Sequence, residues 1–376
     1  MPWKERSIMS QRLEFVELAS QPGSNRRELC RRFGISPTTA YKWLRRYARE
    51  GVSALTDRSR RPHHSSRQTA AEKEALVVAV RDEHPRWGGR KIRRRLNDLG
   101  HAGIPAASTI TTIVRRTGRA LGAPGVVPIP WQRFEAAAPN ALWQMDFKGH
   151  FALRHGRCHP LTIVDDHSRF AVGLRACGKE RGATVQAELT TLFERYGLPE
   201  AMVMDNGAPW RGPGATLSTL EVWLLRLGIH VRHGRPYHPQ TQGKDERFHR
   251  TLQAEVLSNR AFVDLAHVQR HFDPWRDVYN LERPHDSLGL ATPASRYQPS
   301  WRRWPTHLPQ VEYGPTDAVR KVQARGEIYF AGRTFFIANA LHRLPVAVRP
   351  ASTEGTYEVF FCHHRIRTIS LQSAAQ

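Results

Sequence analysis

The sequence predicts a multidomain protein with α-helical, α/β and β parts, in that order along the chain. Its 376 residues exceed the length of one ordinary domain. The first part shows helical periodicity around two glycine-containing turns, and from about residue 142 strand-like runs alternate with helices. After about residue 315 the strand-like runs stand alone. We therefore expect two small helical domains, one mixed α/β domain and one small β domain.

The charge balance predicts a polyanionic partner. There are 57 Lys and Arg residues against 34 Asp and Glu, a net charge of +23, and neutralising phosphates with such residues releases counterions. No apolar run is long enough to span a membrane, and the N-terminus lacks the hydrophobic region of a signal peptide. The four scattered cysteines argue against a disulfide scaffold and a cysteine zinc finger. We expect a cytoplasmic nucleic-acid protein with no membrane association.

Residues 1–60 have the pattern of a helix-turn-helix domain. Gly34 suits the turn, Ser36 suits an N-cap and Pro37 suits the first helical position. The helix that follows has an apolar stripe and a polar, basic remainder, as in a helix that enters the major groove. The alternative is a solvated basic face on a small bundle. The residues expected to contact DNA are Thr38, Thr39, Lys42, Arg45 and Arg46.

Residues 70–122 predict a second helix-turn-helix-like domain, after a polar linker at 57–70. Ile92, Leu96 and Leu99 are expected to share one buried face. Ser108 is expected to cap the next helix, which places Ile110 inside. Two such units in tandem would read a longer DNA site than either alone.

Residues 123–138 are rich in Pro and Gly and are interpreted as a linker, and residues 139–300 as the mixed α/β domain. Residues 142–147 alternate like a strand, and residues 160–164 and 170–174 read as two more. The wholly apolar run 201–204 predicts a central strand that ends at Asp205. Further helices and one short strand lead to a helix that begins at Lys244. Residues 312–372 contain several short strands, which predict a small β-barrel.

Three acidic residues are the candidates for chemistry. Asp146 lies in the first strand, Asp205 follows the apolar strand, and Glu246 lies on the last helix, away from the stripe of Phe248 and Leu252. Three converging carboxylates in a basic protein suit two Mg²⁺ or Mn²⁺ ions for phosphoryl transfer. Each acid alone also fits an ordinary structural position. Asp165 and Asp166 are interpreted as residues of a hairpin corner.

Three stretches together resemble the signatures of insertion-sequence transposases with a retroviral-integrase-type catalytic core. They are Trp143–Gly149, Asp205–Trp210 and His238–His249. The resemblance implies an RNase H-like fold and a DDE triad, carried here by Asp146, Asp205 and Glu246 as catalytic residues and metal ligands. It also places Lys244, Arg250 and the loop of His238 close to the scissile DNA. The end of the chain is similar to the small barrel that follows such cores.

The separation of Asp205 from Glu246 is longer than is usual in the wider family, and the excess is assigned to the loop after Trp210. The resulting hypothesis is a bacterial DNA transposase that binds terminal inverted repeats, cuts there and joins the 3′-OH ends to target DNA. We expect double-stranded DNA as its partner and a homo-oligomer on that DNA. Two alternatives are a sequence-specific regulator with an inactive core and a plain RNase H-like nuclease or junction resolvase.

Overall fold

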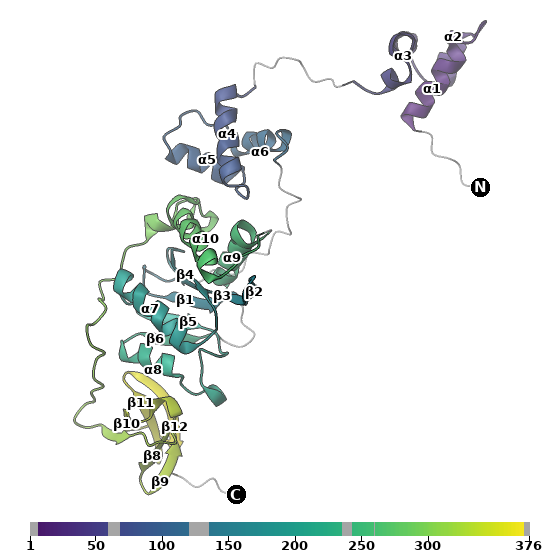
Figure 1. The fold of residues 1–376 in the computed structure, drawn as a ribbon. Helices are drawn as coiled ribbons and strands as arrows, with labels where there is room; N and C mark the ends of the chain where they lie inside the picture. Colours follow the sequence, from purple (N-terminus) through teal and green to yellow (C-terminus); the bar gives the residue numbers. More distant parts are fainter. Residues whose placement is uncertain (1–6, 59–67, 120–134, 235–242, 259, 372–376) are drawn as a thin grey trace, which may run out of the picture. The chain divides into compact units, whose positions relative to one another are not determined.

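The computed structural model describes residues 7–58, 68–119, 135–234, 243–258 and 260–371 (Figure 1). The chain divides into two compact units, Met1–Gln68 and Thr69–Gln376. Most of both expected linkers, at 57–70 and 123–138, lies outside the described residues. Among the described helices, none is both long and apolar enough to cross a membrane.

The first unit consists of α1 (Ile8–Ala19), α2 (Arg26–Arg32) and α3 (Pro37–Glu50), followed by a short 3₁₀ turn. The glycine of the turn and the N-cap serine of α3 have the roles that the sequence predicts. Gly34 has a φ of 63°, and the Ser36 hydroxyl accepts a hydrogen bond from the Thr39 amide at 3.2 Å. Trp43 packs with Phe15 in the core of this unit. The remaining faces of α3 are polar and basic.

The second unit begins with α4 (Ala71–Glu83), α5 (Gly89–Asp98) and α6 (Ala107–Arg116). These helices enclose their own core around Trp87, Ile92 and Ile110. Two predictions about this region are wrong. Leu99 is 51% exposed, because the chain leaves the helical conformation there, just before a left-handed Gly100. Ser108 does not cap α6, since it is the second residue of the helix and the N-cap position belongs to an alanine.

A six-stranded mixed sheet forms the centre of the second unit. Its strands are β1 (Trp143–Phe147), β2 (Phe151–Ala152), β3 (Arg157–Asp165), β4 (Ala171–Cys177), β5 (Ala201–Met204) and β6 (His230–His233). The order is β2-β3-β1-β5-β6, and β4 also pairs with β3. β1 runs antiparallel to β3 and parallel to β5. β1 therefore lies inside the sheet and is buried on both faces, rather than alternating as predicted, whereas β5 is fully buried as predicted.

Helices cover both faces of this sheet (Figure 1). One apolar cluster joins β1 and β5 to α7 (Gly182–Tyr196) and α8 (Thr219–Arg226). A second cluster joins β3 and β4 to α9 (Gly243–Leu252) and α10 (Leu265–Asp277). Within each strand, residues that face the two clusters largely alternate, as the pleat of a strand requires. Short π-helical turns, η4 (Gln253–Leu257) and η5 (Val278–Glu282), extend α9 and α10.

The C-terminal part holds a four-stranded antiparallel sheet in the order β12-β11-β10-β7 and a separate hairpin of β8 and β9. The strands are β7 (Ala318–Lys321), β8 (Glu327–Phe330), β9 (Arg333–Phe336), β10 (Pro345–Pro350), β11 (Thr356–Phe361) and β12 (His364–Ser370). The sequence did not predict β7 and β12, which are rich in exposed basic residues. The closed barrel stays a prediction, since the described strands form these two separate sheets.

Candidate active site

Asp146 lies on the central strand β1 and is only partly accessible. Its pKa is raised to about 7, first by burial and then by the negative charges of Asp205 and Glu180. The Phe147 amide donates to this carboxylate and opposes the shift. Asp146 is therefore a carboxyl group whose charged form gains from a nearby cation.

Asp205 follows β5 directly and is exposed. β1 and β5 pair in parallel with Gln144 opposite Val203, so the same register, continued along both strands, places Asp146 opposite Asp205. The carboxyl ends of these two parallel strands thus bring the two acids to one edge of the sheet, where ligands of open α/β sheets bind.

Hydrogen bonds fix the backbone at Asp205. The Asn206 amide donates to the Asp205 carboxylate at 2.6 Å, and the Asn206 side chain donates to the Gly234 carbonyl at 2.6 Å. His233 donates from Nδ1 to the Asp205 carbonyl at 2.9 Å, and its Nε2 lies 2.7 Å from a carboxyl oxygen of Glu221. Glu221 is 1% exposed and ties this loop to α8.

Glu246 lies in the first turn of α9 and is exposed. The helix packs across β1 and buries Phe248 and Leu252 in the adjoining cluster. The structure therefore pairs Asp146 with Asp205 and carries Glu246 on a neighbouring helix. Among the described residues, these three carboxylates do not form a group whose oxygens all lie within 4.8 Å of one another.

Asp245 is the acidic residue of α9 that points into the protein. It is 2% exposed, and its Oδ1 has no hydrogen-bond partner. Its pKa is raised well above the usual range by burial, and then by the charges of Asp146 and Asp166. Asp245 was not predicted from the sequence, although Asp245, Phe248 and Leu252 follow the i, i+3, i+7 spacing of one helix face.

Asp166 and Lys244 form a buried ion pair between the β3–β4 corner and the start of α9. Asp166 is fully buried and also accepts hydrogen bonds from the Ala136 amide at 2.7 Å and the Gln144 side chain at 2.6 Å. Burial lowers the pKa of Lys244. The corner prediction gave the correct place for Asp166 but missed that it anchors the helix of Glu246.

A second link joins α9 to β1 through Thr162 on β3. The Thr162 hydroxyl donates to the Asp146 carbonyl at 3.0 Å and lies 2.8 Å from Nε2 of His249. Since its one hydrogen points to Asp146, the hydroxyl accepts from His249. Burial, with the charge of Lys148, lowers the pKa of His249 to about 4, which keeps this ring neutral near pH 7.

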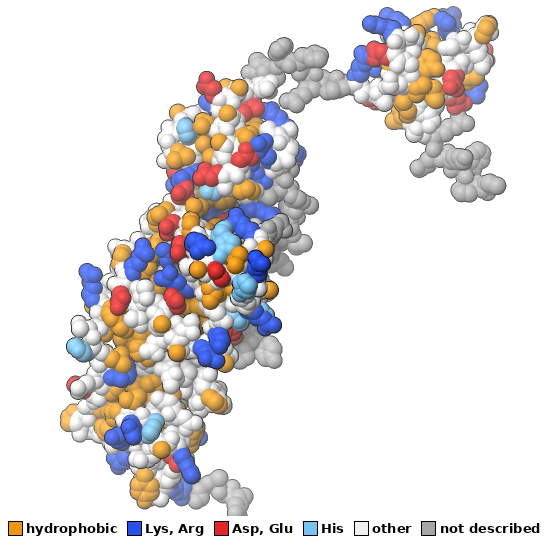
Figure 2. Space-filling view, viewed as in Figure 1, with side chains coloured by type: hydrophobic (Ala, Val, Ile, Leu, Met, Phe, Trp, Pro, Cys, Tyr) orange, Lys and Arg blue, Asp and Glu red, His pale blue; other side chains and the backbone are white. Residues whose placement is uncertain are grey.

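Cationic side chains surround this part of the sheet. Figure 2 shows Lys, Arg and His side chains gathered over α9 and the neighbouring strands. Lys148 follows β1 and donates to Gln253 at 2.7 Å. Arg250 is exposed on α9. His238, predicted to lie near DNA, falls outside the described residues.

The residues predicted to contact DNA from the first unit lie on α3. Thr38, Lys42 and Arg45 are exposed, and Thr39 and Arg46 are partly exposed. Thr39 also serves the N-cap of the helix. Lys42 and Arg46 lie against the Trp43 ring, with their charged groups 4.7 and 5.0 Å from its centroid. The indole thus holds two cations at the surface of this helix.

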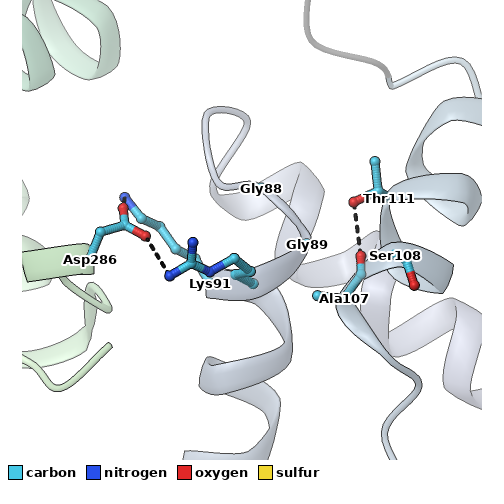
Figure 3. A pocket seen from close by; sticks show the side chains of 8 residues that line it. Gly88, Gly89, Lys91, Ala107, Ser108, Thr111 and Asp286 are labelled. Carbon is cyan, nitrogen blue, oxygen red and sulfur yellow. Dashed lines mark hydrogen bonds and ion pairs between the residues drawn. The ribbon is translucent and has the colours of Figure 1, made fainter. Parts of the chain in front are cut away.

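The second set of helices carries a pocket of about 520 Å³ (Figure 3). It lies where α5 and α6 begin, and neither helix has a side-chain cap there. Lys91 lines the pocket, and burial lowers its pKa to about 8. Both Lys91 and Arg90 lie 3.5 Å from the Asp286 carboxylate.

Domain models of known families match most of the chain. Residues 136–239 and 227–293 match integrase core domains. Residues 11–63 match a helix-turn-helix domain and residues 39–114 a homeodomain-like domain. Residues 317–376 match the C-terminal domain of IS481 family transposases.

Curated relatives agree with these matches. A protein of insertion element IS407 from Burkholderia multivorans is 27% identical over 239 residues, which cover 62% of this chain and 82% of that protein. A protein of insertion element IS476 from Xanthomonas euvesicatoria is 31% identical over 159 residues, covering 42% of this chain and 44% of that protein. The chain is therefore similar to insertion-sequence transposases with a retroviral-integrase-type core, as its motifs led us to expect. Both regions expected to hold helix-turn-helix units also match models of such domains.

Viral proteins are also similar to part of this chain. The Gag-Pro-Pol polyprotein of sheep pulmonary adenomatosis virus is 31% identical over 202 residues, which cover 50% of this chain and 11% of that polyprotein. Among solved structures, the catalytic core domain of BIV integrase is 24% identical, with a TM-score of 0.33, and the match covers 42% of this chain and 93% of that chain.

Proposed function

We propose that this chain is a DNA transposase that binds the terminal inverted repeats of its element, cuts at the element ends and joins the 3′-OH ends to target DNA. One observation carries the proposal. Asp146 and Asp205 lie at the carboxyl ends of two parallel strands, beside the helix of Glu246, in a segment that matches an integrase core. The protein would act on the DNA of a bacterial cytoplasm.

The donor set fits hard divalent cations. Asp146, Asp205 and Glu246 offer only carboxylate oxygens, which Mg²⁺ and Mn²⁺ prefer. Burial and the charge of Asp205 raise the pKa of Asp146, so a cation would stabilise its charged form. These three residues would hold two ions, which supply Lewis-acid stabilisation of the attacking and leaving oxygens of a phosphoryl transfer.

Two phosphoryl transfers account for the reaction. Water attacks a phosphodiester at the element end, the bond from phosphorus to the 3′ oxygen breaks, and that oxygen takes a proton to give a 3′-OH. The 3′-OH then attacks a target phosphodiester, a new 3′ ester forms, and the target 3′ oxygen leaves and takes a proton. Positioning and charge stabilisation supply most of the catalysis in such transfers.

The other residues of the site would hold DNA and carboxylates in place. Lys148 and Arg250 would contact the phosphates that flank the scissile bond. Residues 1–122 would recognise the inverted repeats, with α3 in the major groove, and residues 139–300 would carry out the chemistry. The strands of residues 312–372 would support contacts to DNA or to another protomer.

A joining assay tests the proposal. The purified protein is incubated with Mg²⁺, a labelled duplex from the DNA that flanks its gene, and a target plasmid. Wild type should join label to the plasmid, whereas Asp146→Asn and Glu246→Gln should bind the duplex without cutting or joining. Glu194→Gln, on the exposed face of α7, is the matched control. The proposal is wrong if the Asp146 and Glu246 variants join at the wild-type rate.

Two further outcomes separate the rival functions. Tight binding of the duplex by wild type without cutting, in Mg²⁺ or Mn²⁺, would favour a DNA-binding regulator. Nicking without joining would favour a nuclease. Two element ends must be brought together, so light scattering of the joined complex should show more than one protomer, and a single protomer that performs both steps would exclude the expected assembly.

A further inference from the structure

Glu83, His84 and Glu282 form a cluster of ligand atoms outside the site described above. Glu83 ends α4, His84 is its C-cap residue, and Glu282 ends η5. One ligand atom of each residue lies within 4.8 Å of the other two. The cluster therefore connects the end of α4 to the end of η5.

His84 contributes a buried ring nitrogen to this cluster. Its side chain is 10% exposed, and its buried Nε2 has no hydrogen-bond partner. Nε2 lies 3.8 Å from the Glu83 carboxylate. The pKa of His84 is lowered, chiefly by burial, which favours the neutral ring that coordinates metals.

Packing fixes the orientation of this ring. His84 stacks on Trp87, with the centroids 3.8 Å apart and the planes inclined by 12°. Trp87 is 1% exposed, and its carbonyl accepts a hydrogen bond from the buried Arg81 at 2.7 Å. A ligand held rigidly before the metal arrives loses little conformational entropy on binding.

Two carboxylates complete the donor set: Glu282 is held in place by an ion pair, and Glu83 is exposed and free to change rotamer. Glu282 forms an ion pair with Arg95, which leaves it a second oxygen and resembles the hydrogen bonding that ligating carboxylates receive in known metal sites. The Glu83 side chain is 68% exposed. It can therefore change rotamer to reach the distance of about 2 Å that a zinc ligand needs.

From this geometry we propose that Glu83, His84 and Glu282 form a second metal site, which takes a transition-metal dication such as Zn²⁺. One imidazole nitrogen and two carboxylate oxygens suit Zn²⁺ better than Mg²⁺, which prefers oxygen ligands alone. Water would complete the coordination. The ion would fasten the end of α4 to η5 and hold these two parts of the second unit together.

Zinc binding to the full-length chain tests the site. Protein stripped with a chelator is titrated with Zn²⁺ by calorimetry, and the zinc-loaded form is examined by X-ray absorption for an imidazole ligand. His84→Phe retains a ring against Trp87 but has no nitrogen donor, and Glu282→Gln removes one carboxylate. His155→Ala, which changes an exposed histidine elsewhere, and Glu246→Gln are the controls.

Wild type and both controls should bind one Zn²⁺ ion at this site with the same affinity. His84→Phe and Glu282→Gln should each bind that ion at least roughly 10-fold more weakly. The melting temperatures of wild type and variants should match in chelator, and Zn²⁺ should raise that of wild type more than that of His84→Phe. If His84→Phe and wild type bind the same number of Zn²⁺ ions with the same affinity, the proposal is wrong. None of these measurements depends on joining activity, so a failure here leaves the proposed function untouched.

Discussion

The pair of Lys244 and Asp166 supports a quantitative prediction about how α9 is held. Lys244→Met keeps most of the side-chain volume but removes the ammonium group. Asp166 is fully buried and would keep only its hydrogen bonds from Ala136 and Gln144. Removing one partner of a buried ion pair costs about 3–5 kcal/mol. Because those two hydrogen bonds remain, we expect the lower end, a loss of about 3 kcal/mol in the unfolding free energy of the second unit.

The measurement must report on the second unit alone, since a chain of two units need not unfold in one step. Pulsed hydrogen exchange of peptides from β1 and β3 during a urea titration gives that resolution. Lys179→Met, at an exposed position before α7, should have almost no effect. The double variant Asp166→Asn/Lys244→Met also removes the buried Asp166 charge that Lys244→Met leaves without its cation. It should therefore be more stable than Lys244→Met alone.

The family resemblance implies that Lys244 lies close to scissile DNA, and a lysine in that position would have a different primary effect. A lysine that only contacts phosphate would leave stability within about 0.5 kcal/mol and would lower DNA affinity and its salt dependence. If Lys244→Met shows that second result, the ion pair of Lys244 and Asp166 does not stabilise the second unit.

Three more predictions test other parts of the molecule. Burial and the charge of Asp205 raise the pKa of Asp146 from 3.8 to about 7. In chelator, the folded state therefore binds a proton at Asp146 more tightly than the unfolded state does, and the protein should lose stability as pH rises from about 4 to 7. Urea unfolding across this range should show a smaller loss of stability in Asp146→Asn. Ser36→Ala removes the N-cap of α3 and should lower the unfolding free energy of the first unit by about 1 kcal/mol, measured by the same exchange method on its peptides; an unchanged value would contradict the cap. Arg45→Ala should weaken binding of the end duplex and lower the slope of log K against log salt by about 1, in fluorescence titrations at several salt concentrations; an unchanged slope would exclude a phosphate contact.

Local sequence signals predicted much of the fold because they act within a few residues. Ser36 and Pro37 start α3, and the apolar run at 201–204 forms a buried interior strand. Leu99 shows the limit of periodicity. Leu99 continues the spacing of Ile92 and Leu96, but α5 ends at Asp98 and the Leu99 side chain stays exposed. Periodicity describes a face only while the helix continues.

The burial of β1 on both of its faces was harder to predict from the sequence. The residues of β1 alternate in polarity, which is typical of a strand with one solvated face. Gln144 is nevertheless 3% exposed, because it donates to the buried Asp166. A polar residue can thus occupy an interior position when a partner far along the chain accepts a hydrogen bond from its side chain, even though the Gln144 Oε1 has no partner. No pattern within one strand reveals that partner.

The candidate carboxylates depend on contacts of different range. Asp146 and Asp205 meet because two parallel strands share a register, and strand ends are visible in the sequence. The position of Glu246 depends instead on α9, which is anchored through Lys244 to Asp166 and through His249 to Thr162. Residues outside the candidate triad therefore set where the third carboxylate lies. It follows that substitutions at Asp166 or Thr162 should affect Glu246 more than they affect Asp205, whose loop is held separately by His233 and Glu221.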